Sequence, residues 1–250
     1  MMSPPDNNSQ KSLPVSVVHS PRGGLVTYHG PGQTVLWPVL DLRSASYRQF
    51  TVRCYSRLLE DTTIAVLQRA MGLVAFTTDD PGVWVQSQAA RNPAKIAALG
   101  VHLRRHVSAL GTAVNVAMPR SGSGSSSTEV FSSSSSEEKT NPWARIVACG
   151  LEGRIVTSAA AEVDGGLAGL DRLLFQAREG GGEEEQMNRE DVVAALWAGE
   201  LAGRIGVDGV ETVGREEVVG LLGDVLDGVD GDDDVSAEEW EYVRALRDGV

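Results

Sequence analysis

The stretch that most constrains the fold of this chain is residues 22–33, which read RGGLVTYHGPGQ. Four glycines and Pro31 surround an arginine, a histidine and a glutamine within twelve residues. Glycine lets the backbone approach a ligand closely, and proline fixes the geometry of a turn. The stretch therefore predicts a binding loop, with a short strand before it at 15–18 and another after it at 34–40.

The spacing of apolar residues predicts a long helix from about Ser46 to Met71. Cys54 lies on the apolar face of that helix, so we expect it to be a small core residue. Two later helices are predicted at 167–178 and 192–205. Further strands are predicted at 82–85, 95–101 and 111–118. A short connection joins the last two strands, which favours antiparallel pairing with Arg104, Arg105 and His106 near the turn.

Two further stretches follow the glycine-rich loop along the chain. Lys95–Gly100 reads KIAALG, and Ala148–Gly150 reads ACG. Together the three resemble the lipoyl(octanoyl) transferases, relatives of the biotin and lipoate protein ligases. The resemblance runs from about Val15 to Ser158. It implies an α+β fold with a biotin/lipoate ligase-like mixed β-sheet packed with helices, lacking the family's first elements.

The resemblance also implies the roles of individual residues. Cys149 is the expected nucleophile, which carries the acyl group as a thioester, and Lys95 is its expected catalytic partner. No cofactor and no metal site are expected. The implied substrate-binding residues are Arg22, Gly23, Gly24, Leu25, Val26, Thr27, Tyr28, His29, Ala98, Leu99, Gly100, Gly111, Thr112 and Ala113.

The implied reaction transfers an octanoyl group from octanoyl-acyl carrier protein to a lysine of a lipoyl domain. Passing the group through a cysteine splits one encounter of two carriers into two simpler steps. A nearby ammonium stabilises the reactive thiolate. The expected acceptors are the lipoyl domains of 2-oxoacid dehydrogenase complexes and the glycine cleavage H protein. The resemblance implies a mitochondrial location in a eukaryote and a cytoplasmic one otherwise.

The sequence departs from the family at several positions. Leu110 stands where the pattern H-G-x-A-x-N has its histidine, Ala148 replaces a proline, and Trp37 replaces a common tyrosine. Fewer residues precede Arg22 than in the family. Two alternatives therefore stay open: a truncated or degenerate homologue that binds carrier proteins without turnover, and an ATP-dependent lipoate ligase, which needs no nucleophilic cysteine.

Charge divides the chain of 250 residues, whose net charge is −12. Residues 1–120 hold 12 Lys and Arg against 6 Asp and Glu, whereas residues 121–250 hold 10 against 28. Attraction to the basic half could steer acidic carrier proteins, although a solvated helix face would show the same pattern. The acidic total disfavours nucleic acid as a partner. The basic residues considered are Arg43, Arg48, Arg53, Arg57, Arg104 and Arg105.

Composition and the resemblance together predict three segments. We expect a disordered lead at 1–14, a domain at 15–178 that resembles the octanoyltransferases, and an acidic helical segment at 179–250. A serine-rich insertion at 121–140 within the second segment cannot bury enough apolar surface to order itself. A hydrophobic content of 42% suffices for one sizeable core. No apolar run approaches the ~20 residues of a membrane span, so we expect no membrane partner, and we expect a monomer.

Overall fold

The computed structural model describes residues 17, 26–87, 92–118, 154–177, 187–214 and 217. The chain divides into two compact units, residues 1–208 and 209–250, and all the elements named below belong to the first. The predicted lead at 1–14, the predicted insertion at 121–140 and the predicted nucleophile Cys149 lie outside the described residues. Within the described ranges, no helix has the length and apolar character to cross a membrane.

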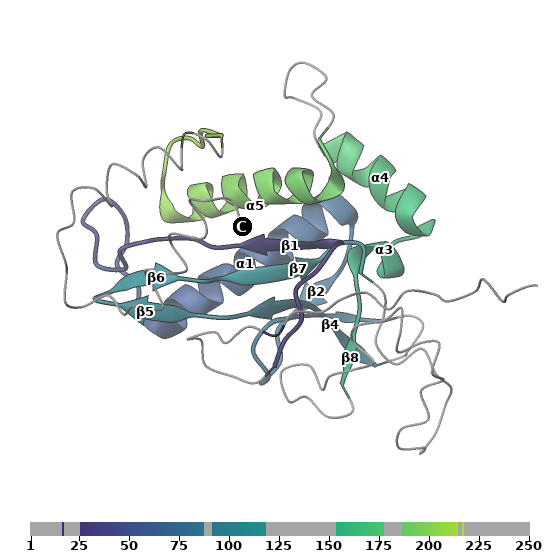
Figure 1. The fold of residues 1–250 in the computed structure, drawn as a ribbon, viewed down its shortest axis with the longest axis horizontal. Coiled ribbons are helices and arrows are strands. Elements are labelled where there is room, and N and C mark those ends of the chain that lie inside the picture. The colour runs from purple at the N-terminus through teal and green to yellow at the C-terminus, as the bar shows by residue number, and fades with distance from the viewer. Residues whose placement is uncertain are drawn as a thin grey trace, which may run out of the picture. The chain divides into compact units, whose positions relative to one another are not determined.

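Within the same ranges, six strands form one mixed sheet (Figure 1). Five of them pair antiparallel in the order β1 (Gln33–Leu36), β7 (Thr112–Asn115), β4 (Pro93–Leu99), β3 (Val83–Gln86) and β2 (Ala75–Phe76). The sixth, β8 (Ile155–Val156), pairs parallel with β4. Between β4 and β7 the chain forms a separate hairpin of β5 (His102–Arg104) and β6 (Val107–Ala109).

The long predicted helix is α1 (Val52–Met71), and it begins six residues later than the periodicity suggested. Thr51 is the N-cap, and its side chain accepts a hydrogen bond from the backbone N–H of Cys54. A threonine at this position fixes the start of a helix, because its side-chain oxygen accepts a hydrogen bond from a backbone N–H of the first turn that has no partner within the helix. Gly72 closes the helix in the left-handed conformation.

The prediction that Cys54 is a core residue was wrong, because Cys54 is exposed. The buried stripe of α1 begins at Tyr55 and continues through Leu58, Leu59 and Thr62. Cys54 precedes that stripe by one position and therefore points about 100° away from Tyr55 around the helix axis. It is left on the solvent side of the first turn.

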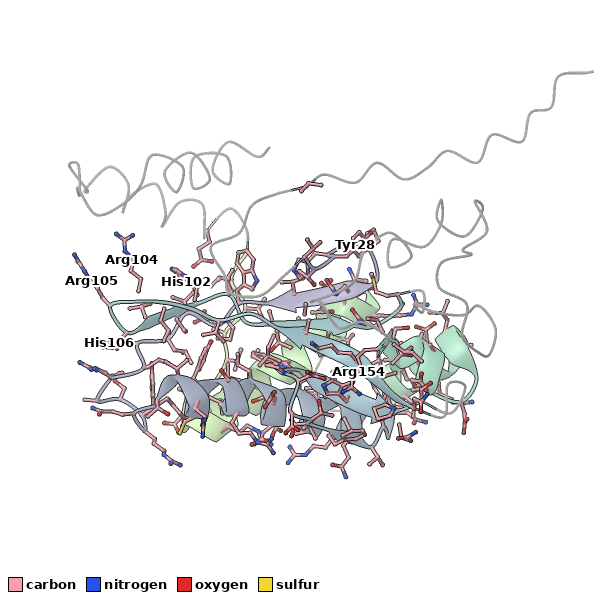
Figure 2. The ribbon with its side chains drawn as sticks, turned by 90° about the horizontal axis from the view of Figure 1, so that it is seen from below. Tyr28, His102, Arg104, Arg105, His106 and Arg154 are labelled. Atoms are coloured by element: carbon pink, nitrogen blue, oxygen red, sulfur yellow. The ribbon has the colours of Figure 1, made fainter. Side chains whose placement is uncertain are left out.

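Of the other described helices, α4 (Gly166–Ala177) and α5 (Arg189–Ile205) pack against α1, and α3 (Ala159–Glu162) packs against α4. Their apolar residues share one core with Ile96 of β4 and Val114 of β7. The described helices therefore cover one face of the sheet, and Figure 2 shows α1 along that face. The opposite face, which we call the helix-free face, faces none of the described helices. The predicted mixed α+β fold is confirmed.

Candidate functional site

Lys95 lies on the helix-free face because strand β4 contains a bulge. Val83 pairs with Ala97 and Trp84 pairs with Lys95, so one step along β3 spans two along β4. Ile96 is the extra residue, and both Ile96 and Ala97 are in the helix-side core. Bulges re-aim the side chains beside them. Lys95 is thereby directed away from the helices, beside the ring of Trp84.

The side chain of Lys95 is buried, with 7% of the residue exposed. Its Nζ lies 5.4 Å from the centre of the fully buried Trp84 ring. Gly82 leaves room for it, because a Cβ at Gly82 would overlap Lys95 Cε. The backbone N–H of Gly82 donates to Glu60 Oε1 at 3.1 Å. A buried ammonium lying over an aromatic ring is held in place by packing and by cation–π attraction.

A second cation lies against Trp84. The Arg154 guanidinium is 5.6 Å from the ring centre, and its Nη2 donates to Asp80 Oδ2 at 3.0 Å. The Trp84 indole N–H donates to the carbonyl of Asp80, which fixes the ring to the same turn. Figure 2 shows Arg154 among the side chains at this part of the sheet. Lys95 and Arg154 thus both lie against the Trp84 ring, and the charge of Arg154 is paired with Asp80.

Strands β7 and β8 pair with the same edge of β4, one after the other along its length, and the change from one to the other falls next to Lys95. β7 pairs with Ala97, Ala98 and Leu99, whereas β8 pairs with Ala94 and Lys95. Val156 is the register partner of Lys95, and the N–H of Thr157 donates to the Lys95 carbonyl at 2.9 Å. The chain thus returns from the segment containing Cys149 into a strand that runs beside Lys95.

The glycine-rich loop is tied to the sheet by a chain of polar contacts. His29 Nδ1 lies 2.7 Å from Gln33 Oε1, and Gln33 Nε2 donates to Asn115 Oδ1 at 2.8 Å. The carbonyl of Gly32 accepts hydrogen bonds from the N–H groups of Val116 and Ala117. His29 is exposed, so its imidazole faces solvent while the loop that carries it is held to the sheet.

Tyr28 is half-buried and packs against Met118 and Val156, the register partner of Lys95. Val26 is exposed and Thr27 is half-buried. The remaining predicted residues of this loop, Arg22, Gly23, Gly24 and Leu25, lie outside the described residues. Tyr28 is thus a residue of the described part of the loop that contacts the strand beside Lys95.

The other two predicted substrate segments lie side by side. Ala98 pairs with Ala113 and Leu99 with Thr112, while the N–H of Gly100 donates to the carbonyl of Gly111. Ala113 also pairs with Val35 of β1. Side chains alternate along a strand, so Val35, Ala113 and Ala98 form a row of small apolar side chains on the helix-free face. We call it the alanine row.

Glycine is required at position 111 by close backbone approach. A Cβ there would overlap the carbonyl oxygen of Leu36 and lie 2.6 Å from Pro38 Cδ. Leu110, which replaces the family's histidine, has a φ of 65°, in the left-handed region that non-glycine residues seldom occupy. The turn into β7 therefore has a tight geometry.

Sequence reasoning missed three residues of this site, Asn115, Thr157 and Glu162. All are buried, and Asn115 Nδ2 donates to the carbonyl of Thr157 at 2.9 Å. The available signal was the final asparagine of the pattern that contains Gly111. No comparable pattern marks Glu162. Among the described residues, no group of three His, Cys, Asp or Glu side chains could hold a metal ion.

Residues 6–162 match the lipoyl protein ligase A/B catalytic domain family. The mitochondrial octanoyltransferase of Saccharomyces cerevisiae is 38% identical over 104 residues, which cover 38% of this chain and 30% of that protein. The octanoyltransferase of Aeromonas hydrophila is 36% identical over 151 residues, covering 59% and 54%. The mitochondrial octanoyl-[acyl-carrier-protein]:protein N-octanoyltransferase of Danio rerio is 32% identical over 161 residues, covering 64% and 58%. The chain therefore spans between 30% and 58% of these relatives.

Proposed function

Because this chain belongs to the lipoyl protein ligase A/B catalytic domain family, we propose that it transfers an octanoyl group from octanoyl-acyl carrier protein to a lysine of a lipoyl domain. The group passes through a thioester on Cys149. The observation that carries the proposal is the buried Lys95 on the helix-free face, beside strand β8. Cys149 precedes Arg154 by five positions, so covalent geometry keeps their Cα atoms within about 18 Å.

In the first step the Cys149 thiolate attacks the carbonyl carbon of the donor thioester. The tetrahedral intermediate collapses with cleavage of the bond from that carbon to the carrier sulfur, and the departing thiolate takes a proton from the Lys95 ammonium. In the second step the lysine amine of the acceptor attacks the enzyme thioester. An amide forms, Cys149 sulfur departs, and the surplus amine proton returns to Lys95.

The alanine row supports the acyl-binding part of the proposal. Ala98 and Ala113 carry the smallest side chains that are still apolar, and they lie opposite each other on adjacent strands. Ala113 is already buried, so an acyl chain along the row would contact mainly Val35, which is 41% exposed, and the half-buried Ala98. Each methylene group that it buries would contribute about 0.8 kcal/mol. Tyr28 and His29, at the neighbouring loop, would contact the end of the chain near its carbonyl.

The proposed partners follow from the same reaction. The donor is octanoyl-acyl carrier protein, which the name of the Danio rerio relative also specifies. The acceptors are lipoyl domains of 2-oxoacid dehydrogenase complexes and the glycine cleavage H protein. Relatives are both mitochondrial and bacterial, so we propose a mitochondrial location in a eukaryotic host and a cytoplasmic one in a bacterium. We propose a monomer that uses no cofactor, with a catalytic domain at 15–178 followed by an acidic helical segment.

The test is covalent loading by octanoyl-acyl carrier protein, followed by intact mass analysis. The two cysteines of the chain, Cys54 and Cys149, provide a matched pair of variants. Wild type and Cys54→Ser should each gain one octanoyl group that hydroxylamine removes, and Cys149→Ser should gain none. Lys95→Met should load at least about tenfold more slowly, because a step helped by proton transfer typically loses 10²–10⁴-fold without it. Loading on Cys54 instead would refute the assignment.

One observation favours a second candidate, a homologue that binds the carrier without turnover. Leu110 stands where the resembled pattern H-G-x-A-x-N has a histidine, and it holds a left-handed backbone conformation, so this turn forms without the polar side chain. This candidate predicts that a folded wild-type chain binds octanoyl-acyl carrier protein but gains no octanoyl mass. Nucleotide binding measured by calorimetry would instead favour an ATP-dependent ligase.

A further inference from the structure

Thr157 is a junction at which three of the site's elements meet. Its N–H donates to the Lys95 carbonyl at 2.9 Å, its own carbonyl accepts from Asn115 Nδ2 at 2.9 Å, and its hydroxyl donates to Glu162 Oε1 at 2.5 Å. Thr157 is fully buried. The backbone and side chain of this one residue therefore connect β4, β7 and α3.

Glu162 anchors the junction. Its Oε1 also accepts a hydrogen bond at 3.0 Å from the hydroxyl of Ser87, which directly follows β3. The residue is 9% exposed, and Ser87 is 2% exposed. A carboxylate is costly to bury unless it is hydrogen-bonded, and bonds to a charged acceptor are roughly twice as strong as neutral ones. Glu162 thus joins the ends of β3 and β8 on either side of Lys95.

Strand β8 needs such an anchor because it is very short. Its ladder with β4 covers only Ile155 and Val156. Two residues of parallel pairing contribute little net stability beside the entropy of ordering their backbone. The bonds made through Thr157 supply the additional attachment. The Ser158 hydroxyl contributes as well, because it donates to the carbonyl of Met118 at 2.7 Å.

We propose that Glu162, acting through Thr157, is a positioning residue that holds β8 against Lys95 and so sets the path along which the chain returns from Cys149. The inference rests on the proposed function only for its kinetic consequence. When the anchor is weakened, β8 separates from β4 more often, and the thiol spends less time within reach of the Lys95 ammonium. Most of the proposed substrate-binding residues lie on the glycine-rich loop, β4 and β7, and Tyr28 of that loop packs on Val156 of β8. The donor dissociation constant should therefore change less than the acylation rate.

The test uses the nearly isosteric change Thr157→Val, with Thr157→Ser as the conservative variant that keeps the hydroxyl. Thr62→Val is the matched control, since Thr62 is also fully buried and its hydroxyl donates to Leu58 within α1, away from β8. Glu162→Gln tests the charge of the acceptor. For each protein, amide hydrogen exchange of residues 154–158 is measured together with the first-order rate of Cys149 acylation and the donor dissociation constant.

We expect Thr157→Val and Glu162→Gln to speed exchange of the Thr157 amide about tenfold or more, the change for a loss of 1.4 kcal/mol in local opening. Both should slow acylation by a similar factor and raise the donor dissociation constant by a clearly smaller one, while Thr157→Ser and Thr62→Val stay near wild type. Unchanged exchange in Thr157→Val would overturn the anchor. Equal slowing of acylation by Thr62→Val would reduce the effect to general destabilisation and overturn the positioning role. A wild-type chain that takes no octanoyl group refutes the proposed function alone, and hydrogen exchange still decides the anchor.

Discussion

Gly82→Ala tests directly whether the packing around Lys95 is as tight as the structure indicates. Gly82 has a φ of 124°, and a Cβ there would overlap Lys95 Cε and lie 2.6 Å from the carbonyl oxygen of Ala97. The unfavourable backbone conformation costs about 1–3 kcal/mol. Displacing buried neighbours costs about 1–3 kcal/mol more. We expect the free energy of unfolding to fall by about 2–6 kcal/mol in total.

Gly72→Ala is the matched control. Gly72 also has a positive φ, 67°, but a Cβ there would meet nothing within 4 Å. The change therefore carries only the conformational cost of a left-handed alanine, about 1–2 kcal/mol. Both variants are compared with wild type by urea denaturation, and the excess cost of Gly82→Ala measures the crowding around Lys95. Equal losses for the two variants would refute the tight packing.

A double-mutant cycle identifies the atoms responsible. Lys95→Ala removes Cε, so Gly82→Ala should cost less in that background, with a coupling of about 0.5–3 kcal/mol, as is usual for residues in contact. The overlap with the backbone of Ala97 remains in both backgrounds, so part of the cost should persist. Additive losses would show that Lys95 does not lie over Gly82, and the description of its burial would be wrong.

Two further predictions concern the basic end of the first unit. The hydrogen bond with the Thr51 side chain holds the pKa of the Cys54 thiol below its ordinary value, and the positive charges of Arg48 and Arg53 lower it further by a smaller amount. In a Cys149→Ser background, alkylation of Cys54 by iodoacetamide should therefore reach half its maximal rate at a lower pH than for a free thiol, and Thr51→Val should raise that pH; a midpoint at the ordinary thiol value would contradict the shift. Arg104 and Arg105 lie at the exposed tip of the β5–β6 hairpin (Figure 2), so reversing both to Glu should slow association with an acidic carrier severalfold at low salt and little at high salt. Arg172→Glu, on the exposed surface of α4, is the control, and equal slowing by both would dismiss a local docking surface.

The sequence alone predicted the elements whose signal is local. The apolar stripe of α1 from Tyr55 to Val66 follows directly from three- and four-residue spacing. The helices predicted at 167–178 and 192–205 are α4 and α5, with bounds within three residues of those predicted. The antiparallel pairing of β4 with β7 was also predicted correctly, because their connection is short. The start of α1 was missed because its boundary is set by one hydrogen bond at Thr51, which periodicity does not register.

Charge patterning located the basic residues in the sequence but did not predict which of them form ion pairs or share a surface. The sequence placed Arg57 with Arg43, Arg48 and Arg53 as one repeated group. In the structure Arg57 forms an ion pair with Asp61 at 3.0 Å, four residues along the same helix. The loop after Asp41 instead meets the hairpin tip, where the N–H of Leu42 donates to the carbonyl of His106. Which arginines share a surface is thus decided by contacts between distant segments.

The position of Lys95 shows why a motif identifies a residue without giving its environment. Strict alternation along β4 would place Lys95 on the same face as Ala97, inside the core shared with the helices. Burying an ammonium there without polar partners would cost several kcal/mol. The bulge at Ile96 removes that conflict, since it lets Ile96 and Ala97 both face the helices and turns Lys95 toward Trp84. A bulge is a local irregularity that tertiary packing stabilises. The bulge that orients the Lys95 amine therefore depends on the burial of the apolar Ile96 side chain as much as on the lysine itself.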